Sequence, residues 1–178
     1  MKKAFTLIEL IFVIAVIGIL SVVIMSRTGS SKVAEAATEF QSHIRYTQHL
    51  AMVDDKFAVN DGSWFKKRWH MLFNGDSYSV LSNGVFAKDA MNNDKNIENI
   101  NLNTKYVVSI ALSGGCLNQT MISFDNVGRP MVGNLNNDTQ AYMDGHMLES
   151  LCVITLSSPG QDDINVTIMQ ETGYVQVR

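Results

Sequence analysis

The chain has 178 residues, a formal net charge of −3 and two cysteines. This length allows one modest globular domain together with an additional segment. The mildly acidic balance argues against general affinity for nucleic acid or for anionic lipid surfaces. No enzyme is predicted, because the histidines are scattered and no serine or cysteine lies beside a recognisable catalytic base. The histidines are His43, His49, His70 and His146.

The first 25 residues combine a basic start with a long apolar run. Lys2 and Lys3 precede this run, and Glu9 is the only charged residue between Leu7 and Met25. As a helix, the run would be about 28 Å long, which is close to the hydrocarbon thickness of a bilayer. A carboxylate there costs on the order of several kcal/mol if it is ionised in lipid without a partner. Glu9 is therefore a functional candidate.

Composition alone allows three interpretations of this segment. It could be a removed secretory signal, a permanent single-pass anchor, or a specialised segment. An ordinary signal has an apolar stretch of about 7–15 residues, and this stretch is longer. Small residues such as Ser26 and Gly29 follow it, so conventional cleavage near them stays open.

The residues from Ala4 to Leu10 read Ala-Phe-Thr-Leu-Ile-Glu-Leu. This order closely resembles the processing site of type IV prepilins and type II secretion pseudopilins. The resemblance implies that a prepilin peptidase cuts between Ala4 and Phe5 and that the new amino terminus of Phe5 is methylated. Most members have glycine in place of Ala4, but alanine is also small, so we expect cleavage. It also implies that Glu9 meets the cationic amino terminus of a neighbouring subunit, which offsets the burial cost of both charges.

These features divide the chain into a leader (1–4), a transmembrane and filament-core helix (5–25), an amphipathic continuation of that helix (26–55) and a β-rich domain (56–178). The resemblance implies that the chain spans the bacterial inner membrane once and that its C-terminal domain lies in the periplasm. Gly29 is a weak point of the rod, because glycine costs about 1 kcal/mol relative to alanine inside a helix. In the third part, apolar residues recur at helical spacing. They are Val33, Ala37, Phe40, Ile44 and Ala51.

From residue 57 onward the pattern is that of short strands. Residues 69–73 and 78–81 flank Asn74-Gly75-Asp76 and predict a hairpin. We expect an α+β fold in which the long N-terminal helix packs on an antiparallel sheet, as in pilin-like proteins. Further strands are predicted at 106–112, 121–124, 153–156, 164–169 and 174–177.

A weaker resemblance extends into the C-terminal half and points to the H-type minor pseudopilins and their relatives among type IV minor pilins. It implies a minor pseudopilin that joins a periplasmic pseudopilus through its N-terminal helix and serves protein secretion. The alternative is a minor pilin of a type IV pilus, with adhesion or DNA uptake as its task. In both cases the partners are other pseudopilins or pilins. The strings that carry this resemblance are 122–125, 128–130, 152–156 and 173–177.

Cys116 and Cys152 lie 36 positions apart. Export to an oxidising space favours a disulfide between them, and the chain-entropy estimate for such a loop is roughly 4 kcal/mol. The alternative is two buried free thiols. Two isolated cysteines lack the close ligand pairs of zinc modules, so no metal site is predicted.

The segment from Trp64 to Trp69 interleaves basic and aromatic residues. Such segments can bind phosphate and stack bases, which makes Lys66, Lys67 and Arg68 candidate nucleic-acid contacts. The alternative, which the acidic domain favours, is a strand-like segment whose aromatic residues pack inward while its lysines are solvated.

Residues 88–103 and 134–144 are rich in asparagine and aspartate. These residues favour turns, and their oxygen atoms are also suited to calcium. The resemblance adds that major pseudopilins carry a calcium site in a loop. Neither stretch has an ordered ligand pattern, so we expect surface loops and no cofactor.

Overall fold

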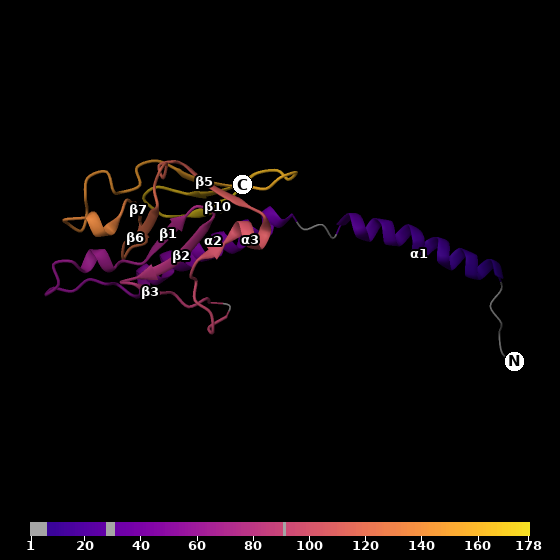
Figure 1. Ribbon diagram of the computed structural model, residues 1–178, viewed down its shortest axis with the longest axis horizontal. Coiled ribbons are helices and arrows are strands. Elements are labelled where there is room, and N and C mark those ends of the chain that lie inside the picture. The colour runs from indigo at the N-terminus through magenta and orange to yellow at the C-terminus, as the bar shows by residue number, and fades with distance from the viewer. Residues whose placement is uncertain (1–6, 28–30, 91) are drawn as a thin grey trace. The chain divides into compact units, whose positions relative to one another are not determined.

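The computed structural model describes residues 7–27, 31–90 and 92–178, and it describes side chains of the first helix only for residues 7–19. The chain divides into two compact units, with the boundary between Ser31 and Lys32. Figure 1 shows the helices and strands and labels most of them.

The first unit contains α1 (Leu7–Arg27), with Glu9 in its first turn. The apolar side chains of residues 7–19 are exposed, and Leu7 and Ile8 have 78% and 74% of their surface accessible. Among the residues that the structure describes, no helix combines the length and the apolar character needed to cross a membrane. The membrane span predicted over residues 5–25 is thus not confirmed.

The second unit begins with α2 (Lys32–Val53), which lies within the amphipathic segment predicted at residues 26–55. Residues 28–30 lie outside the described residues, so the predicted continuity of the rod and the weak point at Gly29 stay predictions. One face of α2 is buried, as its spacing predicts. The fully buried residues on it include Val33, Ala37 and Phe40.

The first sheet has six antiparallel strands in the order β3-β2-β1-β6-β7, with β4 also pairing with β2. In the confirmed hairpin of β1 and β2, Phe73 pairs with Tyr78. Gly75 in its turn has a φ of 58°, which glycine adopts without strain. The strands are β1 (His70–Asn74), β2 (Ser77–Ser82), β3 (Val85–Phe86), β4 (Ile100–Asn101), β6 (Met121–Phe124) and β7 (Pro130–Val132).

The second sheet has four antiparallel strands in the order β10-β9-β8-β5. The α+β class is therefore confirmed, but the strands form two sheets where we expected one. The predicted disulfide between Cys116 and Cys152 is present and fully buried. It links the start of β8 to the residues that follow β5 at one end of this sheet. The strands are β5 (Ser109–Gly114), β8 (Cys152–Ser157), β9 (Ile164–Ile168) and β10 (Val175–Val177).

Two predicted elements are wrong. The strand predicted at 106–112 starts only at Ser109, because Tyr106 ends the short helix α3 (Leu102–Tyr106) and Val107 caps it in the left-handed conformation. The side chain of Asn101 caps this helix by accepting a hydrogen bond from the Thr104 N–H at 2.7 Å. The strand-like segment expected at 64–69 is instead the 3₁₀-helix η1 (Trp64–Lys67), and a second such turn is η2 (Leu135–Asn137).

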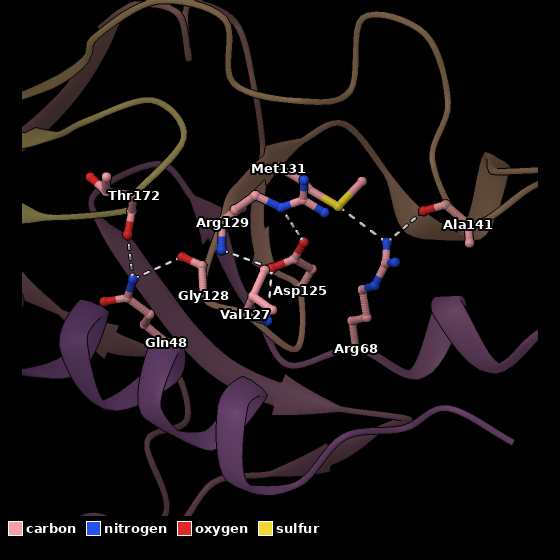
Figure 2. A network of polar contacts seen from close by, with 9 residues as sticks. All are labelled: Gln48, Arg68, Asp125, Val127, Gly128, Arg129, Met131, Ala141 and Thr172. Atoms are coloured by element: carbon pink, nitrogen blue, oxygen red, sulfur yellow. Dashed lines mark hydrogen bonds and ion pairs between the residues drawn. The ribbon is translucent and has the colours of Figure 1, made fainter.

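Polar side chains of α2 donate hydrogen bonds to backbone carbonyl groups of both sheets. Gln41 and Arg45 donate to the carbonyl oxygen of Val175 in β10, at 3.2 and 2.8 Å. One turn further, the Gln48 side chain donates to the carbonyl oxygens of Gly128 and Thr172, at 2.8 and 3.0 Å (Figure 2). Each of the last two carbonyls belongs to the turn of a different sheet.

The two turns approach so closely that only glycine fits. A Cβ atom on Gly173 would lie 2.5 Å from the Gly128 carbonyl oxygen and 2.6 Å from the Gln48 amide nitrogen. Gly173 also has a φ of 64°. The close approach of the two turns therefore requires a residue without a side chain at position 173.

We predict that Gly173→Ala lowers the free energy of unfolding by about 3 kcal/mol or more, because it adds a backbone clash to left-handed strain. The matched control is Gly160→Ala, where φ is 74° but no atom lies within 4 Å of the added Cβ. This control introduces the left-handed backbone strain without the clash, and we expect it to lower the free energy of unfolding by about 1 kcal/mol. Urea unfolding followed by tryptophan fluorescence measures both, and equal losses would contradict the close contact.

Candidate functional site

The residues predicted for processing and assembly lie at the start of the chain. Ala4 and Phe5 lie outside the described residues, so their cleavage and methylation stay predictions. Glu9 lies in the first turn of α1, where a negative charge is favourable beside the helix N-terminus. The residues around it are apolar on all sides, which is typical of a helix buried in lipid or inside an assembly.

The three cations predicted as nucleic-acid contacts do not form one basic surface. Arg68 is only 4% exposed, and its Cζ lies 5.0 Å from the Trp64 ring centroid and 4.7 Å from that of Tyr142. Its guanidinium donates to the Ala141 carbonyl oxygen at 2.7 Å (Figure 2). The prediction for Arg68 is wrong, because a guanidinium enclosed by aromatic rings cannot reach a phosphate backbone in solvent.

The two lysines remain partly exposed. The Nζ atom of Lys67 lies 2.7 Å from an Asp61 carboxylate oxygen, and this hydrogen bond, together with those from Ser63, lowers the pKa of Asp61 to about 2. Lys66 donates to the carbonyl oxygen of Asn136 in η2, at 3.0 Å. The lysines thus keep ammonium donors at the surface, although Asp61 offsets part of their charge.

Asp125 organises the turn between β6 and β7. Its side chain is fully buried and accepts hydrogen bonds from the Val127 and Arg129 N–H groups, at 3.1 and 2.8 Å. The Arg129 Nε also donates to it at 2.7 Å, and this bond raises the pKa of Arg129 (Figure 2). Arg129 stacks on Tyr142 at 5.5 Å, so the Tyr142 ring contacts two guanidinium groups. This network attaches the asparagine-rich loop at 134–144 to the first sheet.

An open hollow of about 730 Å³ beside α2 brings together residues that sequence reasoning missed. Its lining includes Glu39, whose carboxylate accepts hydrogen bonds from Lys105 Nζ at 2.7 Å and from the Tyr106 hydroxyl at 2.6 Å. His43 also lines it, and its Nδ1 lies 2.7 Å from the Tyr78 hydroxyl.

Burial determines the protonation of the His43–Tyr78 pair. Burial lowers the pKa of His43 and raises that of Tyr78 well above 10.0. The hydroxyl therefore keeps its proton, and it shares a hydrogen bond with a neutral imidazole. The amphipathic pattern places His43 on α2, but no local signal indicates a partner 35 positions away.

Across the part of the chain that the structure describes, no group of three or more His, Cys, Asp or Glu residues is placed to hold a metal ion. The expectation that the chain binds no cofactor stays a prediction. The disulfide accounts for both cysteines.

Comparison with protein-family models supports the N-terminal motif. Residues 1–25 match the model of the prokaryotic N-terminal methylation motif. The chain thus carries a prepilin-type methylation motif, in agreement with the type IV pilin-like and pseudopilin superfamily, and the predicted resemblance is confirmed at this level. The match does not identify the H-type branch. Searches among curated proteins and among solved structures gave no match.

We predict that the free energy of unfolding falls as the pH drops below about 6.5. Burial lowers the pKa values of His43 and His70 below their ordinary 6.5, so the unfolded chain binds more protons than the folded chain. Stability from the neutral imidazoles is complete above pH 6.5 and declines below it, with a limit of about 1.4 kcal/mol per pH unit for each histidine.

Urea unfolding at pH 7.5, 6.5 and 5.5 measures this dependence. His43→Gln should reduce the slope, whereas His49→Gln, at an exposed position of the same helix, should leave it unchanged. A slope that is the same in wild type and in His43→Gln would contradict the assignment.

Proposed function

We propose that this chain is a minor pseudopilin, a subunit of the periplasmic pseudopilus that drives protein secretion in a type II secretion system. The observation that carries the proposal is the methylation motif at residues 1–25, which continues into an apolar helix with a single acidic residue. The role is structural, and we propose no catalytic activity.

The N-terminal helix serves two environments in this proposal. Before assembly, the apolar side chains of α1 lie in the inner membrane, and the second unit lies in the periplasm. In the filament, the same side chains pack against the helices of neighbouring subunits. A helix that is apolar on all sides is stable in both settings, because neither exposes it to water.

Glu9 gives the assembly its register. Removal of residues 1–4 by prepilin peptidase leaves a methylated ammonium on Phe5, and this group on one subunit pairs with Glu9 on the next. In a low-dielectric bundle the two charges attract strongly, and each removes the uncompensated burial cost of the other.

The disulfide of the second unit supports a location of this unit outside the cytoplasm. Its buried disulfide suits an oxidising compartment, where such bonds form and persist. The same N-terminal motif also serves type IV pili, so the alternative is a minor pilin of a surface pilus. The filament with which the chain co-purifies distinguishes the two.

We predict cleavage between Ala4 and Phe5 in a strain that contains prepilin peptidase. Intact-mass measurement of the purified chain should give a product that starts at Phe5 and carries one methyl group. Ala4→Leu should block cleavage, because a bulky side chain replaces a small one at the cut, and Ala4→Gly should preserve it. Normal processing of Ala4→Leu would contradict the assigned site.

We predict that Glu9→Ala lowers incorporation into sheared filaments at least tenfold, since an uncompensated ammonium in the filament core costs more than about 1.4 kcal/mol. The amount in the membrane should stay the same. Glu149→Ala, which removes an exposed carboxylate of the second unit, is the matched control. Immunoblots of sheared and membrane fractions measure both, and wild-type incorporation of Glu9→Ala would remove the assembly role.

A further inference from the structure

A second hollow, of about 410 Å³, lies where η1, η2 and the turn between β2 and β3 meet. None of the described residues that line it is acidic. Polar groups line most of its wall, and they are distinct from the residues assigned to processing and assembly. They include Ser63, Lys66, Lys67, His70, Asn83 and Asn136.

His70 contributes a ring nitrogen to this hollow. The residue is only 6% exposed, and its Nδ1 lies 2.8 Å from the carbonyl oxygen of Arg68. A carbonyl oxygen can only accept, so Nδ1 carries the proton and Nε2 keeps a lone pair. Within the described part of the chain, Nε2 has no hydrogen-bond partner. Nε2 is not enclosed by the protein, so it is free to accept a hydrogen bond from a ligand in the hollow.

The lysines supply donors with fixed positions. Lys66 is held by its bond to the Asn136 carbonyl oxygen, and Lys67 is held by Asp61. An ammonium group has three donors, so each lysine keeps donors for a further acceptor. Asp61 neutralises part of the Lys67 charge but does not line the hollow, which leaves the wall itself cationic.

We propose that this hollow binds a small oxyanion, a phosphate or a carboxylate group, between the ammonium groups of Lys66 and Lys67 and the Nε2 atom of His70. Charge-assisted hydrogen bonds from the lysines hold the anion oxygens. A hydrogenphosphate donates its O–H to the Nε2 lone pair. A carboxylate has no proton to donate, so it binds when Nε2 is protonated and donates a hydrogen bond to a carboxylate oxygen. The segment that contains Lys66 and Lys67 is therefore an anion-binding pocket wall.

The test is a titration of the full-length chain in detergent micelles with inorganic phosphate at pH 7.5. Ionic strength is held constant with sodium chloride, and the histidines are ¹⁵N-labelled. We expect a saturable shift of the His70 ring resonances, with much smaller shifts at the remaining histidines. Acetate is titrated in the same way, so binding of phosphate alone, of acetate alone or of both identifies the oxyanion.

Two variants locate the binding. Lys66→Gln removes one charged donor and should weaken binding roughly tenfold. Asn83→Asp places a carboxylate at the pocket wall and should abolish binding. Its matched control is Asn99→Asp, because both asparagines have positive φ values, 50° and 47°, and Asn99 lies outside the hollow. Aspartate tolerates this backbone conformation as asparagine does.

The proposal is overturned if neither anion gives a saturable His70 shift, or if chloride alone produces the same change. It is also overturned if Lys66→Gln and Asn83→Asp bind like the wild type. Circular dichroism checks the fold of each variant, and Lys66→Gln decides the outcome if Asn83→Asp does not fold, because Lys66 is partly exposed.

Discussion

The second unit depends on the way α2 satisfies the backbone groups of both sheets. A buried apolar stripe would hold the helix against either sheet, but it would leave edge carbonyls unpaired. Gln41 and Arg45 bond to the edge strand β10, and Gln48 bonds to a turn of each sheet. The helix therefore fills the core and also pairs one carbonyl group of the edge strand β10. A paired carbonyl at an edge is not available for pairing with another chain.

Local features of the sequence predicted much of the fold and the N-terminal methylation motif. The motif from Ala4 to Leu10 is contiguous, and the hairpin depends on the turn at Gly75, so neither needs knowledge of distant residues. The apolar spacing of α2 likewise shows its buried face. The start of β5 was wrong because capping by Asn101 makes the preceding residues helical, and this competes with their strand pattern.

The polar sites were harder to predict, because their partners are far apart in the chain. Arg68 and Lys67 are adjacent and chemically similar, but one is enclosed by Trp64 and Tyr142 while the other stays near the surface. The environments of these two residues differ because the loop that carries Tyr142 packs over Arg68. The same reason explains why the His43–Tyr78 pair left no mark in a local pattern.

The bonding of α2 to both sheets also has a mechanical consequence. A subunit that is pulled or held through its N-terminal segment receives the load at Lys32, where the second unit begins. Because α2 packs against strands of both sheets and Gln48 bonds to a turn of each, a load on this helix passes to both sheets. A rod fixed to only one sheet would transmit force through the weakest hairpin. Here the two sheets resist as one body, which suits a part that is moved by its helix.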